Sequence, residues 1–265
     1  MWVQLARPSY NQAMNRDAGS EEKRTVRDEV GVTDSVGWES RSYYSIGWLT
    51  AADIMKARAE EVGGGQDRPD QPVADEMRAC VLSAVTASAA FLEAHINELF
   101  DDAHEYRDDP ASPLLRGLRR EAQIRVAALW PHVKMYRVIE KYAIALDLAE
   151  ADPFDRGAEP AQSVEDLRRV RNHYIHYQPD SVRNGVAEGD DKKLSNRMQG
   201  KIKLPDWDEG SADVFPTRAL CPDLARWAVE SVVRFADAFC DRLRVTRNYD
   251  HVRPDWLRQG EQEHD

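Results

Sequence analysis

The sequence predicts an all-α fold, an up-and-down helical bundle with additions at both ends. Apolar residues recur every three, four or seven positions along the longest segments, which is the spacing of one helix face. Proline and glycine residues interrupt the chain between these segments and mark where helices end. Apolar and polar residues alternate only weakly, at 200–204, so strands are expected to contribute little.

Punctuating residues set the limits of each element. Thr50 is expected to cap a short helix, which the run at 63–69 ends because it contains three glycines and a proline. Pro131 is expected to separate two helices, and Ser163 to cap the next. The glycine-rich and charged segment 180–219 is expected to be a long loop with a short hairpin. The expected helices lie at 50–62, 73–106, 113–130, 131–149, 160–179 and 222–245.

Composition divides the chain into four parts. The first 37 residues are polar, and we expect them to be loosely ordered or to form an arm that docks elsewhere. Residues 38–68 form a short aromatic and helical extension that ends in a glycine-rich linker. The helical domain occupies 69–245, and a polar C-terminal tail follows at 246–265.

Charge and composition exclude several classes of protein. Among 265 residues, 36 Lys+Arg and 47 Asp+Glu give a net charge of −11, which argues against binding nucleic acid by bulk charge but permits a local basic surface. The N-terminus lacks the apolar core of a secretory signal, and no stretch approaches the ~20 apolar residues of a membrane span. The three scattered cysteines do not form a disulfide framework or a zinc site. We expect a cytoplasmic protein with no membrane contact.

The segment 167–179 is the richest in potential chemistry, because it places three arginines, an asparagine and two histidines near the end of one helix. Residues at i, i+4 and i+8 share a helix face, so Arg168, Asn172 and His176 are expected in one row. Arg171 lies about 140° around the axis from His176 and must reach sideways to meet it.

Pro179 disfavours the α conformation at Gln178, so His176 is expected at the helix end, where it can face a cleft. Cations also gather at helix C-termini because the helix dipole attracts them. Spacing alone therefore favours ordinary terminal charges, and the wider pattern of the chain is needed to argue for a site.

The run Arg171-Asn172-x-x-x-His176 resembles the RNxxxH form of the Rx4–6H motif of the HEPN superfamily of all-helical domains. The segment 87–100 is similar to the first long helix of bacterial members. The resemblance covers about residues 73–245, interrupted by the loop at 180–219. Flanking residues are also typical of this helix: Leu167, Val170, Ile175, Tyr177 and Pro179.

The resemblance implies a metal-independent endoribonuclease of a toxin–antitoxin or antiviral-defence system, needing no cofactor. It implies RNA as substrate, a homodimer with a composite cleft, and an antitoxin or defence protein as partner. His176 would be the general acid/base, Arg171 would bind the scissile phosphate, and Asn172 would orient one of them. The alternative is a non-catalytic HEPN-like module that binds a protein partner or a nucleotide.

One position departs from the family pattern. In the subgroup paired with a nucleotidyltransferase antitoxin, a tyrosine stands two residues after the histidine, whereas this chain has Gln178 there and Tyr177 directly after His176. We therefore do not expect the regulatory modification of that subgroup.

Other side chains are expected to support the site: Arg168, His173, Tyr177, Glu93 and Asn97. Glu93 and Asn97 are spaced i, i+4 on the first long helix. They either fix Arg171 or His176, or form an exposed face or a buried structural hydrogen bond, and the sequence leaves these alternatives open. His95 lies on another face and is expected to be structural. His173 and His176 lack further nearby ligands, so no metal site is expected.

A basic stretch offers a candidate surface for RNA phosphates. Residues 116–141 carry seven Lys and Arg against two Glu, a local charge of +5. Such runs are more often solvated helix faces, so the RNA contact is the less favoured of the two interpretations. Its candidate residues are Arg116, Arg119, Arg120, Arg125, Lys134 and Arg137.

Overall fold

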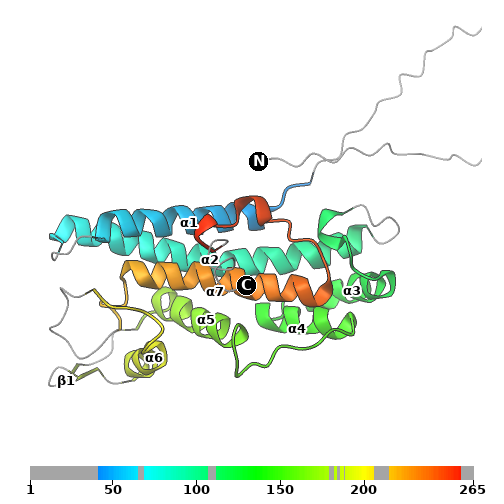
Figure 1. Cartoon of the computed structure of the whole chain (residues 1–265). Coiled ribbons are helices and arrows are strands. Elements are labelled where there is room, and N and C mark those ends of the chain that lie inside the picture. Colours follow the sequence, from blue (N-terminus) through cyan, green and yellow to red (C-terminus); the bar gives the residue numbers. More distant parts are fainter. Residues whose placement is uncertain are drawn as a thin grey trace, which may run out of the picture. The chain divides into compact units, whose positions relative to one another are not determined.

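The computed structural model describes residues 41–64, 69–106, 112–178, 182–183, 186–187, 189–205 and 215–257. The predicted all-α fold is confirmed, because nearly all of the described secondary structure is helical (Figure 1). The expected arm at 1–37 and the end of the expected tail, 258–265, lie outside the described residues.

Seven α-helices occur in the described residues, together with two 3-10 turns and one hairpin whose strands have two residues each. The helices are α1 (Tyr44–Gly63), α2 (Gln71–Glu105), α3 (Arg120–Val133), α4 (Val138–Leu148), α5 (Ala161–Ile175), α6 (Asp190–Met198) and α7 (Pro222–Leu243). The 3-10 turns are η1 (Pro113–Leu115) and η2 (Asp250–Val252), and β1 (Val182–Arg183) pairs antiparallel with β2 (Val186–Ala187).

The helix α2 is the centre of the bundle. It packs against α1 and α7, which run beside it, while α4 and α5 cover the side of α7 away from α1 (Figure 1). The core between these helices is aromatic, because Phe91, Tyr142, Phe235 and Phe239 are fully buried in it. His95 is buried among these rings, so its expected structural role is confirmed. The three cysteines are buried free thiols.

α2 contains an apolar stretch of a length not expected from the sequence. An 18-residue window within Gln71–Glu105 has a mean hydropathy of 1.5, and among the described helices it alone is long and apolar enough to cross a membrane. Of that window, 56% is buried inside the bundle. Its packing against α1 and α7 accounts for its apolar character.

α1 begins at Tyr44, and the expectation that Thr50 caps it is wrong. The backbone N–H and the hydroxyl of Ser45 both donate to the carboxylate of Glu98 on α2. The first turn is therefore capped by another helix, while the Thr50 hydroxyl donates to the Ile46 carbonyl inside α1. Leu49 is buried, so α1 is part of the same compact unit as the rest of the bundle.

Gly63 allows a close approach of three helices. A Cβ added there would lie 2.4 Å from Met77 Sδ of α2 and 2.9 Å from Pro222 Cγ of α7. Contacts this short do not occur between packed atoms, so any side chain at this position would require Met77 or Pro222 to move.

Pro131 does not end α3, which continues to Val133. Proline lacks the N–H that would bond to the carbonyl of residue 127 four positions earlier. That carbonyl instead accepts a hydrogen bond from His104 Nδ1 of α2, at 3.1 Å. The tertiary contact compensates for the bond that proline cannot make, and the helix break moves to residues 134–137.

Two further expectations are corrected around α5. Ser163 does not cap this helix, which begins at Ala161 after Pro160, and its hydroxyl donates to Glu159 Oε1. The segment expected to be a loop contains α6, and its hairpin is β1–β2 rather than 200–204. Hydrophobic packing accounts for α6, because its Leu194 and Met198 are buried in the core.

Candidate functional site

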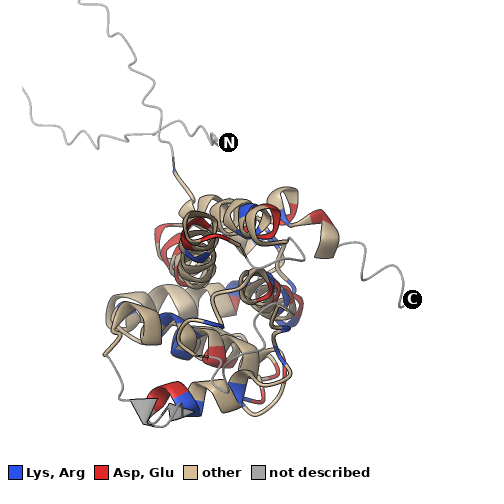
Figure 2. Ribbon diagram, turned by 90° about the vertical axis from the view of Figure 1, so that its left-hand side faces the viewer, with Lys and Arg blue, Asp and Glu red and all other residues tan. Residues whose placement is uncertain are grey.

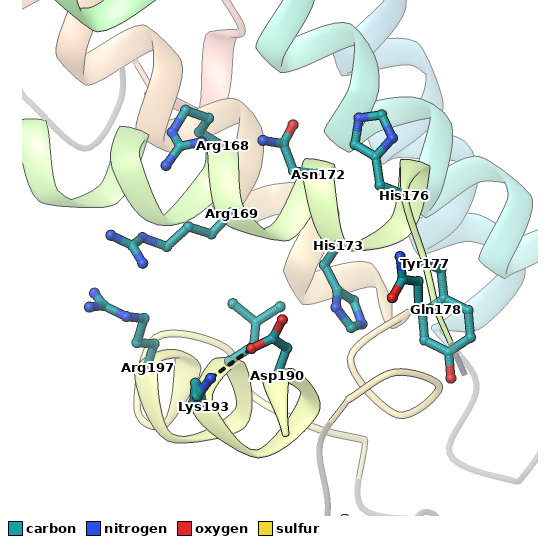
Figure 3. Close-up of a pocket in the computed structure, with 11 residues that line it drawn as sticks. Arg168, Arg169, Asn172, His173, His176, Tyr177, Gln178, Asp190, Lys193 and Arg197 are labelled. Carbon is teal, nitrogen blue, oxygen red and sulfur yellow. Dashed lines mark hydrogen bonds and ion pairs between the residues drawn. The ribbon is translucent and has the colours of Figure 1, made fainter. Parts of the chain in front are cut away.

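The C-terminal half of α5 carries the candidate site. The helix ends at Ile175, and the backbone N–H of His176 donates to the Asn172 carbonyl at 2.9 Å. His176 therefore lies at the helix end, as its position before Pro179 predicts. Arg168, Asn172 and His176 project from one edge of α5 in a row (Figure 3).

A pocket of about 460 Å³ lies between α5 and α6. From α5 it is lined by the Arg168–Asn172–His176 row and by Arg169 and His173, and Tyr177 and Gln178 line it just beyond the helix end. From α6 it is lined by Asp190, Lys193, Leu194 and Arg197. The lining thus includes four cationic side chains and one carboxylate, although ion pairs with Glu165, Asp166 and Asp190 offset much of the positive charge.

The His176 imidazole is exposed at the rim of this pocket. Within the part of the chain that the structure describes, its ring makes no hydrogen bond. An exposed imidazole at the rim of a pocket can accept a proton from a bound molecule and return it.

Arg171 faces away from this pocket. Its Nη1 donates to Asn172 Oδ1 at 2.9 Å, and its side chain lines a smaller pocket of about 80 Å³ together with Glu93 and Ile139. Its Nε is buried and has no hydrogen-bond partner among the described residues. Arg171 is thus hydrogen-bonded to the row of His176 through Asn172, and Arg168 of that row lines the smaller pocket beside it.

Arg168 and Arg169 are held along α5 by one carboxylate. The Nε and Nη2 atoms of Arg168 donate to the two oxygens of Glu165, at 3.0 and 2.7 Å, and Arg169 Nη2 lies 3.3 Å from Glu165 Oε1. The hydrogen bonds from Arg168 lower the pKa of Glu165. The pair fixes Arg168 beside Asn172 instead of leaving it free to move.

Ion pairs dock α6 against α5 and form the second wall of the pocket. Asp166 is buried on α5 and accepts from Arg197 Nη1 at 3.1 Å and from Lys201 Nζ at 2.8 Å. At the other end of α6, His173 Nε2 lies 2.9 Å from Asp191 Oδ1, an ion-pair distance without hydrogen-bond alignment. His173 thus positions α6. The rings of His173 and Tyr177 pack in a T-shaped arrangement.

Glu93 and Asn97 make different contacts, although both lie near Lys141 of α4. Asn97 Oδ1 accepts a hydrogen bond from Lys141 Nζ at 2.8 Å, which is the structural alternative left open by the sequence. Burial lowers the pKa of Lys141, whose ammonium lies 5.7 Å from the Trp130 ring centre. Glu93 instead shares the smaller pocket with Arg171.

Most of the basic residues at 116–137 bond to the protein itself. Arg119 and Arg125 both bond to Glu150 and to carbonyls at the end of α4. Arg120 donates to Gln123, and Lys134 lies over the Trp130 ring. Arg116 is exposed, and Arg137 lines a second large pocket beside α5. Lys and Arg positions are interspersed with Asp and Glu positions along the described helices (Figure 2).

The sequence offers Lys193 and Arg197 as basic residues of the segment 180–219 that could bind phosphates, but it does not predict the helix that brings them to the pocket. It gives Arg169, which also lines the pocket, no role of its own. A helix signal was present, because Asp190 and Asp191 form an acidic first turn after Gly189 and Leu194 and Met198 are spaced i, i+4. In the described residues, no cluster of three or more His, Cys, Asp or Glu side chains is placed to hold a metal ion.

Comparison of the chain with protein-family models, curated proteins and solved structures finds no match to any of them.

Proposed function

We propose that this protein is a metal-independent endoribonuclease of the HEPN type, acting in the cytoplasm as a toxin or antiviral-defence effector. The observation that carries the proposal concerns the His176 imidazole. Its ring makes no hydrogen bond to any described residue and lies at the rim of a pocket lined by four cationic side chains. The RNxxxH run on α5 supports the same activity.

RNA supplies its own nucleophile in this proposal. A neutral imidazole takes the proton of a 2′-OH, whose oxygen attacks the adjacent phosphorus while the bond to the 5′ oxygen breaks. An imidazolium protonates that leaving oxygen, so the products are a 2′,3′-cyclic phosphate and a 5′-OH. In a homodimer, the two copies of His176 supply both groups.

The charge that develops on the phosphoryl oxygens needs fixed donors nearby. Arg171 is proposed to provide them. Its Nη1 donates to Asn172 Oδ1 at 2.9 Å, which holds the guanidinium next to the row of His176. A buried Nε without a described partner is an unfavourable arrangement, which a phosphoryl oxygen would relieve if the side chain turned toward it.

Cleavage of total RNA in EDTA tests the proposal. His176→Ala removes the proton-transfer group and is expected to lower the rate about 10²–10⁴-fold. The matched control is His132→Ala, since His132 is an exposed histidine of α3 outside the pocket. Inert wild-type protein, or full activity of the His176 variant, would contradict the ribonuclease proposal.

One observation favours the alternative, a non-catalytic module that binds a protein or a nucleotide. Arg171 lines a different pocket from His176, and the pocket cations Arg168, Lys193 and Arg197 are each paired with a carboxylate. RNA bound without cleavage by the wild-type protein would support this function. An antitoxin or defence protein remains the proposed partner in either case.

A further inference from the structure

We infer that the pocket between α5 and α6 continues into a second pocket, and that the two form one arginine-lined trough for the phosphates of a single RNA strand. This inference deepens the proposed function and rests on it for the identity of the polyanion. It places the RNA path along α5 and α6, and of the basic stretch at 116–137 it includes only Arg137.

The second pocket has a volume of about 410 Å³ and lies at the N-terminal end of α5, beside the start of α4. It shares Arg168, Arg169 and Arg197 with the first pocket, so these three side chains line both. Arg169 and Arg197 extend from the two helices toward this shared end (Figure 3). Arg137 and Arg156 line the far part of the second pocket.

The cations of the trough exceed the carboxylates that face them. Glu165 is occupied by Arg168 and Arg169, and buried Asp166 by Arg197 and Lys201. Glu140 accepts from the backbone N–H of Arg137.

No described carboxylate forms an ion pair with the guanidinium groups of Arg137 and Arg156, although both line the trough. Guanidinium groups without carboxylate partners are ready donors for phosphates, which they bind with two parallel hydrogen bonds.

The length of the trough fits several phosphates rather than one. The fifteen residues of α5 span about 22 Å at 1.5 Å per residue, and the two pockets follow this helix from its first turn to His176. At the His176 end, the Tyr177 side chain is 42% exposed. An exposed ring beside a cationic groove stacks on an unpaired base, which favours a single strand over a duplex.

Binding of a labelled twelve-nucleotide single-stranded RNA tests the trough. All proteins carry His176→Ala, so that the RNA stays intact and binding is measured apart from cleavage. The test variant adds Arg137→Gln and Arg156→Gln. The matched control adds Arg58→Gln and Arg78→Gln, which remove the same charge from the exposed α1–α2 hairpin. Affinities are measured by fluorescence anisotropy at several salt concentrations.

The trough variant is expected to bind about tenfold more weakly than its parent, because two guanidinium groups no longer donate to phosphates. The slope of log affinity against log salt should fall by about 1.4, roughly 0.7 for each phosphate of a single strand that the variant leaves unneutralised. The control should keep the parent's affinity and slope. Equal binding by the trough variant and its parent would overturn the inference.

The outcomes separate this inference from the proposed function. Weaker binding by the trough variant, with wild-type protein that never cleaves RNA, would keep the trough and reject the nuclease. Cleavage by wild type with unchanged binding by the trough variant would keep the nuclease and reject the trough. Absence of RNA binding by the parent would overturn the trough.

Discussion

Asn172 is the residue at which the two halves of the candidate site meet. It lines the α5–α6 pocket beside His176, and its side-chain oxygen accepts from Arg171, which lines the neighbouring pocket. Adjacent residues on a helix point in different directions, about 100° apart. The Arg171–Asn172 pair therefore connects the two cavities, both of which Arg168 also lines.

His95 shows how burial sets the chemistry of one side chain. The Tyr142 hydroxyl donates its proton to the Leu92 carbonyl. His95 Nδ1 must therefore donate to the Tyr142 oxygen, at 3.0 Å. The other ring nitrogen lies 4.0 Å from Cys240 Sγ. Burial lowers the pKa of His95 to about 4, because a charged ring would have no solvent around it.

The stability of the fold should therefore depend on pH through His95. Its folded pKa lies below the ordinary unfolded value near 6.5, so its stabilising effect is complete above pH 6.5 and is lost as the pH falls toward 4. The loss amounts to about 3 kcal/mol in the free energy of unfolding. Urea unfolding of wild type and His95→Gln between pH 7 and 4.5 measures it, and the variant should show the shallower fall.

Two other buried groups act in the opposite direction. Burial raises the pKa of Glu98 and Asp237, so both favour the folded state as the pH falls. Comparison of wild type with His95→Gln at each pH removes the contribution of Glu98 and Asp237 to the free energy of unfolding. Exposed His251→Gln is the control and should follow the wild type. Parallel pH profiles for wild type and His95→Gln would show that His95 does not titrate in this range.

Among the elements, α6 depends most on its neighbours. It has nine residues, and helices this short are not stable alone in water. Two buried apolar residues and the ion pairs of Asp166 hold it against α5. The second wall of the pocket therefore exists only while these contacts persist.

Asp166→Ala should release α6 without unfolding the bundle. The change leaves Arg197 and Lys201 without their buried carboxylate, and α6 loses its strongest polar anchor. Backbone amides at 190–198 should exchange with deuterium at least about tenfold faster, while those of α2 stay protected.

Lys193→Ala is the control for this experiment, since the exposed Lys193–Asp190 pair at 2.9 Å contributes little. Unchanged exchange in α6 of the Asp166 variant would mean that apolar packing alone docks the helix. A global increase that includes α2 would mean that Asp166 supports the whole bundle.

For the whole molecule, the surface around the end of α5 bears on the proposed homodimer. Ile175 and Tyr177 are 48% and 42% exposed on either side of His176. Apolar side chains around a functional residue are typical of surfaces that meet another protein. A second copy of the chain would cover Ile175 and bring two imidazoles to one cleft, while Tyr177 faces the RNA.

Wild-type protein is therefore expected to sediment at twice the chain mass of 30.2 kDa. Ile175→Asp places a charge on the proposed contact and should give a monomer with at least about tenfold lower RNA cleavage. Ile54→Asp changes an equally exposed isoleucine of α1 and should leave the dimer intact. Monomeric wild-type protein that cleaves RNA would contradict the composite cleft.

Much of the bundle could be predicted because long helices carry their own signals. The stripe at 73–106 and the segment 222–245 coincide with α2 and α7 to within two residues at each end. The row of Arg168, Asn172 and His176, and the helix end at His176, follow from helix geometry and from Pro179.

The remaining features depend on partners far away in the sequence. Glu98 caps α1 from another helix, and His104 bonds to the carbonyl that Pro131 leaves open. An ion pair with buried Asp166 holds Arg197 beside the pocket, and Arg171 lines a pocket that three helices create together. Composition and spacing contain no information about such pairings.

The sequence by itself therefore determined the helical class, the face shared by three residues of α5 and the position of His176. Tertiary structure decided which side chains of that helix face the pocket and which cations are already paired. The physical reason is that helix periodicity is a local property of the backbone. Hydrogen bonds, ion pairs and cavities form only when separate helices pack.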